Sequence, residues 1–168
     1  RLSHVMNLYA KMNNPFTFNG DIGQWTPDRI ASTLMSLSDG ENEISDYYTT
    51  IDLSGSSEIG LSDEQKATLE KIANFEISGD EAWDALSDTL GEIGYDGIKY
   101  LNTFEGDKNS YSYLALKQSD VKSADPVTYD DNDQPIPITE RFNLESPDTR
   151  YSQGGNETEA IEDRKSVV

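Results

Sequence analysis

A single glutamate follows a predicted strand in the second half of the chain. Glu105 comes just after the apolar segment 97–101, and the Gly-containing segment 106–109 leads from it into a second predicted strand, 111–116. A carboxylate held at the end of a strand can bind a ribose hydroxyl or stabilise an oxocarbenium-like centre through its charge. The residue types alone leave a competing interpretation, which is a solvated loop glutamate.

Two other sets of residues have types that could do chemistry. Asp130, Asp131 and Asp133 crowd carboxylates together as a calcium site does, but the turn glycine and the distal bidentate glutamate of an EF-hand loop are absent. This pattern favours a solvated tight turn. His4 is the only histidine and could act as a base or orient a ligand. A lone histidine near the start of a chain is more often a surface residue.

The composition narrows the classes of partner. The chain has 168 residues, with 32 acidic against 13 basic side chains and a formal net charge of −19. This charge argues against binding to a nucleic-acid backbone or to an anionic membrane, whereas a basic protein partner is compatible with it. Cysteine is absent, which excludes disulfides, thiolate nucleophiles and zinc–thiolate sites. No stretch approaches the apolar length of a membrane span.

Apolar spacing predicts the first elements of the fold. Alternating apolar residues predict a half-buried strand over 5–12, which Asn13-Asn14-Pro15 ends. Thr26-Pro27-Asp28 is typical of a helix start, with threonine at the N-cap and proline in the first turn. The helix that follows is expected to bury Ile30, Leu34 and Leu37.

Two more helices are predicted after a polar segment. Residues 38–60 read as a loop with room for a short strand near 47–51. Ser62-Asp63-Glu64-Gln65 and Ser78-Gly79-Asp80-Glu81 each fit a capping box. The apolar stripes behind them are Leu61, Leu69, Ile72 and Phe75 for the first helix, and Trp83, Leu86, Leu90 and Ile93 for the second, which Gly94 is suited to end.

The composition changes after Asp125, where prolines punctuate a polar, acidic stretch. We therefore expect three regions: a folded core over 1–124, an ordered surface arm over 125–151, and a disordered tail or linker over 152–168. The acidic run that begins at Tyr129 is predicted to form a tight turn.

Several motifs follow one another in a specific order. They are Gly94-Tyr95-Asp96-Gly97-Ile98-Lys99-Tyr100, then Asn102-Thr103-Phe104-Glu105-Gly106, then Ser112-Tyr113-Leu114-Ala115-Leu116, the segment 121–131 and the segment 136–143. Together with the upstream segment that ends in Asn14-Pro15, they resemble the C-terminal half of ADP-ribosyltransferase-like domains in large phage and mobile-element polyvalent proteins. The resemblance covers about residues 4–151 and is most specific over 94–143.

The resemblance implies an α+β fold with an ADP-ribosyltransferase-like split β-sheet, two or three helices and an irregular acidic C-terminal arm. It also implies NAD as the substrate, with transfer of ADP-ribose to a host or phage protein acceptor. By the same resemblance Glu105 would be the catalytic acid. Asn102 and Ser112 would be supporting polar groups at the NAD site, and Tyr113 would be a wall for a ring. No metal site is expected.

The chain also departs from the family in two places. Ser112 stands where the late strand of poly-ADP-ribose polymerases carries the catalytic glutamate. The family's first motifs lie before the segment 5–12, so we expect this chain to be inactive without the rest of its parent polypeptide. The alternative is a non-catalytic structural, cargo or interaction module, and a third interpretation is an acidic decoy for a basic groove. The resemblance places the protein in a phage virion or in the cytoplasm of a bacterial host.

Overall fold

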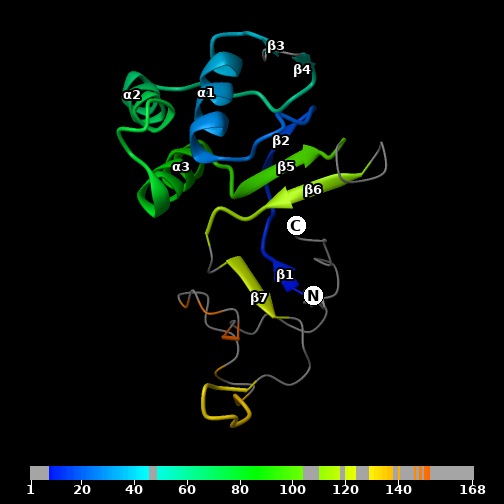
Figure 1. Cartoon of the computed structure of the whole chain (residues 1–168), viewed down its shortest axis with the longest axis vertical. Helices are drawn as coiled ribbons and strands as arrows, with labels where there is room; N and C mark the ends of the chain where they lie inside the picture. Colours follow the sequence, from blue (N-terminus) through cyan, green and yellow to red (C-terminus); the bar gives the residue numbers. More distant parts are fainter. Residues whose placement is uncertain are drawn as a thin grey trace. The chain divides into compact units, whose positions relative to one another are not determined.

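Helices and short strands occur together along the chain, which confirms the predicted α+β class. The computed structural model describes residues 8–45, 49–103, 110–117, 120–123, 129–137, 140, 146, 148, 150 and 151 (Figure 1). The chain divides into two compact units, Asn14–Leu116 and a second unit formed by Arg1–Asn13 with Lys117–Val168. The split-sheet arrangement that the resemblance implies stays a prediction.

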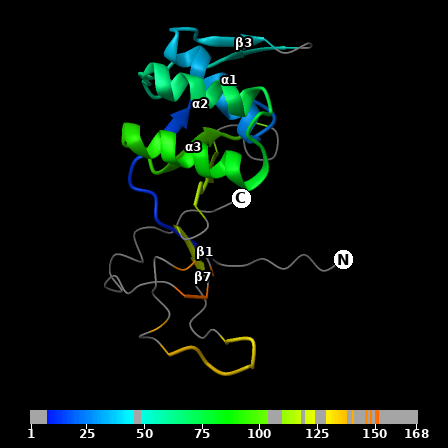
Figure 2. The same ribbon diagram turned by 90° about the vertical axis from the view of Figure 1, so that its left-hand side faces the viewer.

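The unit Asn14–Leu116 is built on a three-stranded sheet in the order β2-β5-β6. Strand β2 (Pro15–Phe18) runs parallel to β5 (Gly97–Leu101), and β5 runs antiparallel to β6 (Tyr111–Leu114). Three helices connect β2 to β5 and lie on one side of the sheet (Figures 1 and 2). They are α1 (Pro27–Ser38), α2 (Asp63–Ala73) and α3 (Gly79–Ile93).

One face of this sheet forms the core with the helices. Phe16 and Phe18 of β2 lie opposite Ile98 and Tyr100 of β5 and share one buried face, because alternate residues of a strand point the same way. The helices cover this face with side chains that are at most 1 % exposed, namely Ile30, Leu34, Leu69, Ile72, Leu86 and Leu90. Leu37, which we expected to be buried with them, is only partly buried.

Strand β2 corrects the sequence prediction, which let Asn13-Asn14-Pro15 end a strand. Proline begins β2 instead, at a strand position where its missing N–H removes no necessary donor. Of the strand predicted over 5–12, the structure describes β1 (Leu8–Ala10). The predicted loop 38–60 also contains a hairpin rather than a single strand, in which β3 (Glu43–Ser45) pairs antiparallel with β4 (Thr50–Asp52).

The helix boundaries agree with the sequence in part. The capping box of α2 is confirmed, because Ser62 and Gln65 each bind the other's backbone N–H through their side chains. The capping box predicted at Ser78 is wrong: its side chain makes no cap hydrogen bond. Gly79, the first residue of α3, has φ +60°, which turns the chain out of the geometry that aligns the cap with the helix amides.

The C-terminal end of α3 agrees with the sequence prediction, whereas the C-terminal end of α2 does not. Gly94 ends α3 in the left-handed conformation, with φ +105°, as predicted. Phe75 was expected in the apolar stripe of α2, but the helix ends at Ala73. Phe75 lies beyond that end with φ +61° and is 68 % exposed.

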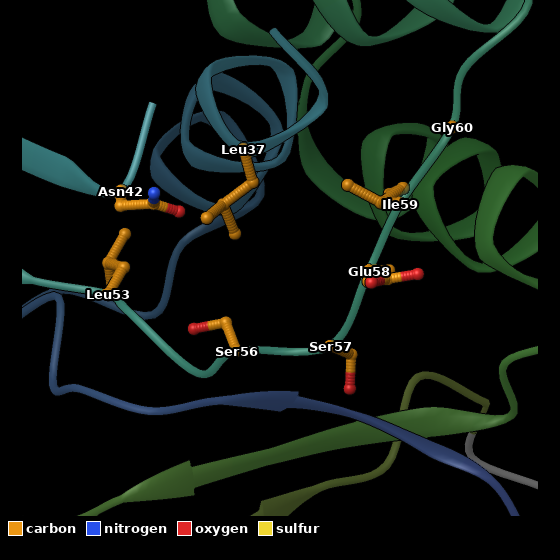
Figure 3. Close-up of a pocket in the computed structure, with 8 residues that line it drawn as sticks. All are labelled: Leu37, Asn42, Leu53, Ser56, Ser57, Glu58, Ile59 and Gly60. Carbon is orange, nitrogen blue, oxygen red and sulfur yellow. The ribbon is translucent and has the colours of Figure 1, made fainter. Parts of the chain in front are cut away.

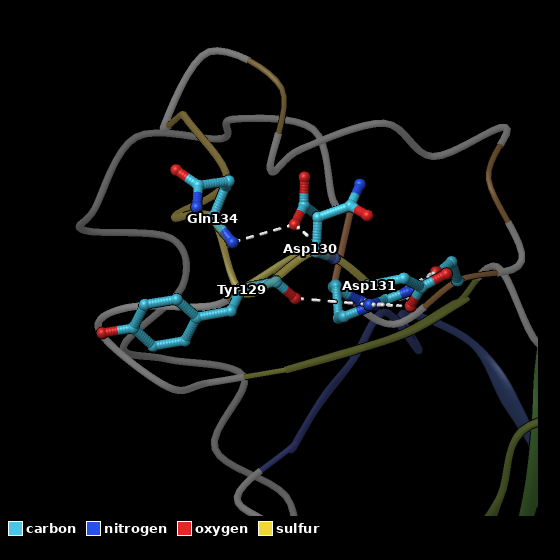
Figure 4. A network of polar contacts seen from close by, with 7 residues as sticks. Tyr129, Asp130, Asp131 and Gln134 are labelled. Atoms are coloured by element: carbon cyan, nitrogen blue, oxygen red, sulfur yellow. Dashed lines mark hydrogen bonds and ion pairs between the residues drawn. The ribbon is translucent and has the colours of Figure 1, made fainter.

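The second unit contains a two-stranded antiparallel sheet and a tight turn that is closed by hydrogen bonds. Strand β1 pairs antiparallel with β7 (Val121–Ser123). Tyr129 and Pro135 bridge the predicted tight turn, and the Asp130 carboxylate accepts hydrogen bonds from the backbone N–H groups of Asn132 and Gln134 (Figure 4). These bonds confirm the turn.

Arg150 ties that turn to a later part of the chain (Figure 4). Its guanidinium pairs with the carboxylates of Asp131 and Asp148, each at 2.7 Å, and donates to the Tyr129 carbonyl. The two carboxylates raise the pKa of Arg150 above its usual value. Within the described residues no three acidic or histidine side chains are grouped to hold a metal ion. In that same part of the chain, no helix has the length and apolar character needed to cross a membrane.

Candidate functional site

The carboxyl ends of β2 and β5 lie at the same edge of the sheet, since the two strands are parallel. Asp21 follows β2 and is 8 % exposed. Its Oδ1 accepts from the Gly23 N–H at 2.9 Å and from the Trp25 indole N–H at 3.1 Å, and its Oδ2 accepts from the Thr103 N–H at 3.2 Å. One carboxylate therefore joins the residues that leave β2 to those that leave β5.

An aromatic stack lies beside this carboxylate. The Trp25 indole stacks on the Tyr100 ring with 3.8 Å between centroids and 24° between planes. Tyr100 is buried, whereas Trp25 is only partly buried and keeps some of its surface accessible to solvent. Asp21 fixes the indole through its N–H, so the orientation of Trp25 is set from two sides.

The structure brings Asn102 and Ser112 together. The Asn102 side-chain amide donates to the Ser112 hydroxyl at 2.9 Å, and these residues are 6 % and 3 % exposed. Ser112 lies opposite Tyr100 in the β5–β6 register, so it shares the buried face of the sheet. These two residues therefore bind one another in the interior, and their part in NAD binding stays a prediction.

Tyr113 lies on the other face of the sheet, because it directly follows Ser112 in β6. It stands opposite Lys99, whose ammonium is 4.3 Å from the Tyr111 ring centroid and 5.8 Å from that of Tyr113. Tyr113 therefore does not share a face with Asn102 and Ser112. Glu105 and His4 lie outside the described residues, and the role of Glu105 stays a prediction.

A hollow of about 400 Å³ lies elsewhere in this unit, between α1 and the segment 53–60 (Figure 3). Leu37 and Ile59 point into it from opposite sides. The hydroxyls of Ser56 and Ser57 accept hydrogen bonds from backbone N–H groups of and next to β2, so the polar wall serves to attach this segment to the sheet. Among the described residues that line it, Glu58 alone is ionisable, and we do not assign the hollow a chemical role.

Arg29 is an unusual cation in the first turn of α1. One of its guanidinium nitrogens is buried and has no hydrogen-bond partner, and within the described residues no carboxylate pairs with it. Buried charged groups are almost always paired, because an unpaired charge loses its hydration without compensation.

The sequence analysis missed Asp21, Trp25 and Arg29. Asp21 could have been found by the reasoning that selected Glu105, since it is an acid just after a strand, but β2 was not recognised as a strand. The buried, unpartnered nitrogen of Arg29 results from tertiary packing, so no local pattern in the sequence predicts it. Comparisons with known protein families, with curated proteins and with solved structures found no match for the chain.

The Asn102–Ser112 pair gives a first testable prediction. Ser112→Ala removes the acceptor of a buried amide donor, and we expect the free energy of unfolding to fall by about 1–3 kcal/mol. Ser110→Ala is the matched control, because no hydrogen bond joins the Ser110 hydroxyl to another described residue; we expect a change within about 0.5 kcal/mol. Urea unfolding measures both. Equal losses in the two variants would contradict a structural role for the pair.

Proposed function

We propose that this chain is an ADP-ribosyltransferase-like domain that binds NAD at the carboxyl ends of β2 and β5, with Glu105 as the acid that holds the ribose. The observation that supports this proposal is the parallel pairing of β2 with β5. Ligands of open sheets that contain parallel strands bind at the carboxyl ends of those strands. The chain leaves β5 there through Asn102 and Thr103 and runs into the segment that carries Glu105.

The proposal gives two other residues a part in NAD binding. The accessible surface of the Trp25 indole supplies a face on which the nicotinamide or the adenine ring stacks. The Arg29 side chain, in which one guanidinium nitrogen has no hydrogen-bond partner, supplies charge-assisted hydrogen bonds to the diphosphate. In the reaction the bond between nicotinamide and ribose breaks, nicotinamide leaves with the bonding electrons, and a nucleophile of the acceptor bonds to the ribose carbon. The Glu105 carboxylate stabilises the positive charge that develops on the ribose.

Calorimetric titration with NAD tests the proposal, and Arg29 provides its sharpest variant. We expect the unsubstituted chain to bind NAD with a dissociation constant between about 1 µM and 1 mM, the usual range for enzyme substrates. Arg29→Met is expected to weaken binding about tenfold, as loss of a charge-assisted hydrogen bond does. The same variant should keep or raise the free energy of unfolding, because it removes a buried nitrogen that has no hydrogen-bond partner.

Lys71→Met is the matched control for that titration. Lys71 is an exposed cation of α2, and the substitution removes the same charge at a place where no described carboxylate forms an ion pair with it. We expect it to change the NAD affinity less than twofold, because exposed charges at a distance are screened by salt. Equal weakening by the two variants would reduce the role of Arg29 to general electrostatics, and absence of NAD binding by the unsubstituted chain would refute the proposed function.

The second candidate function is a non-catalytic interaction module. The buried contact between Asn102 and Ser112 favours it, because two residues expected to face NAD bind one another instead. On this interpretation the partner is a basic protein that matches the net charge of −19. Its signature is the absence of any NAD effect together with a partner affinity that falls steeply as ionic strength rises.

A further inference from the structure

The turn between α2 and α3 carries an exposed aromatic ring. Phe75 is 68 % exposed, whereas Ile77, two residues later, packs against the core. Among the large apolar side chains of the described residues, Phe75 is the most exposed, ahead of Tyr129 and Tyr111. Figure 1 shows this turn at the edge of the helix layer that lies farthest from β5 and β6. The ring therefore contributes little to the core and is accessible to another molecule.

The backbone of the turn gives no reason for a phenylalanine at this position. Phe75 has φ +61°, a left-handed conformation that bulky residues rarely adopt and that glycine adopts without strain. Gly94 takes the left-handed conformation after α3. The hydrogen bond from the Phe75 N–H to the Ile72 carbonyl, at 3.1 Å, uses only main-chain atoms. Neither the core nor the turn accounts for the ring.

The charges around the ring indicate which kind of molecule it contacts. Four of the five exposed charged side chains between 70 and 81 are acidic. The acids are Glu70, Glu76, Asp80 and Glu81, and the cation is Lys71. An acidic border disfavours a nucleic acid, an anionic membrane and a second copy of this chain, which carries its own net charge of −19. It favours a protein surface whose lysines and arginines face these carboxylates.

We propose that the α2–α3 turn is a docking surface for a basic protein. The Phe75 ring enters an apolar pocket of that protein, and the acidic side chains around the ring pair with lysines or arginines at the rim of the pocket. Protein interfaces commonly have this arrangement, with an apolar centre enriched in aromatic residues and a polar rim. The docking surface is independent of NAD binding, and it supplies the second candidate function with a defined contact.

A lysine–leucine peptide that forms an amphipathic helix is the probe, because its apolar stripe is bordered by cations. We expect calorimetry to detect binding to the unsubstituted chain, with an affinity that falls as ionic strength rises. Phe75→Ala is expected to weaken binding at least about tenfold, as truncation of a central interface residue does. Tyr129→Ala is the matched control, since it removes another exposed aromatic side chain, which is 52 % exposed. It should change the affinity less than about twofold.

Phe75→Gly separates docking from folding. The substitution removes the ring and places at this φ the residue that adopts it without strain. We expect the same loss of peptide affinity as with Phe75→Ala, together with a melting temperature that is unchanged or higher by about 2–4 °C. A melting temperature that falls by this amount would show that the ring supports the fold, and would overturn its assignment to docking.

Three further outcomes would overturn the docking surface. The first is a failure of the unsubstituted chain to bind the lysine–leucine peptide, and the second is equal weakening by Phe75→Ala and Tyr129→Ala. The third is a dimer of the unsubstituted chain in sedimentation that Phe75→Ala dissociates, because the occupant would then be a second copy. A peptide with serine in place of leucine measures the charge contribution alone and should bind at least about tenfold more weakly. Each of these measurements is made without NAD, so their failure leaves the proposed function standing.

Discussion

Replacing Glu105 with glutamine is expected to lower the rate of ADP-ribose transfer by at least about a hundredfold, the usual loss when one electrostatic group of a transition state is removed. Glutamine has the same shape but no charge, so it cannot stabilise an oxocarbenium-like ribose. NAD affinity should change little, because the positive charge on the ribose develops only in the transition state. The measurement is transfer of labelled ADP-ribose from NAD to protein acceptors, with the protein at its natural full length.

Glu58→Gln is the control for that experiment. Glu58 is an exposed carboxylate of the same unit, and toward the described residues its backbone carbonyl alone makes a hydrogen bond, with the Tyr95 hydroxyl. The substitution removes the same charge away from the proposed site and should leave transfer unchanged. Labelling that is as strong with Glu105→Gln as with Glu58→Gln would remove Glu105 from the mechanism.

Phe18→Ala is expected to cost about 3–5 kcal/mol of unfolding free energy, the range for a fully buried phenylalanine. Phe18 has no exposed surface. Its ring lies 4.8 Å from the Phe16 centroid and 5.3 Å from the Trp25 centroid, so the substitution leaves a cavity and also removes two aromatic contacts. The free energy of unfolding of domains of this size is about 5–15 kcal/mol, so Phe18→Ala removes a large share of the total stability. Urea unfolding followed by circular dichroism measures it.

Phe75→Ala is the control, since it makes the same chemical change at a side chain that is 68 % exposed. Little apolar surface is lost there, and we expect a change within about 0.5 kcal/mol. A loss at Phe75 as large as the loss at Phe18 would show that the core is not where the structure places it.

Local signals in the sequence predicted the helices well and β2 poorly. The capping box at Ser62 and the glycine at the end of α3 act within one helical turn, so nearby residues are enough to reveal them. Pro15 misled the analysis, because whether a proline ends or begins a strand depends on which partner strand lies beside it. At Ser78 the pattern of the capping box was present, but the backbone conformation of Gly79 was not deducible from it.

The same distinction applies to the candidate site. The sequence named Asn102 and Ser112, and the structure joins them because Asn102 directly follows β5 and Ser112 lies in the neighbouring strand β6. It could not show that they face the core while Tyr113 faces away, since that depends on which face of the sheet the helices cover. Asp21 and Arg29 could be recognised only from tertiary contacts. Asp21 accepts a hydrogen bond from the Thr103 N–H, and Arg29 has a buried nitrogen without a hydrogen-bond partner.

The parallel pairing of β2 with β5 has a consequence for how the molecule forms. All three helices lie in the connection between these strands, and such a long loop closes only after an appreciable loss of chain entropy. We expect the helices to fold early and the strand pair to form late, because local contacts form before a long loop closes. An intermediate with intact helices would therefore lack the whole edge that Asp21 and Thr103 create, and would expose the unpaired Phe16-Thr17-Phe18 strand to association with other chains. Any ligand that binds this edge would draw the folding equilibrium toward the native state by mass action.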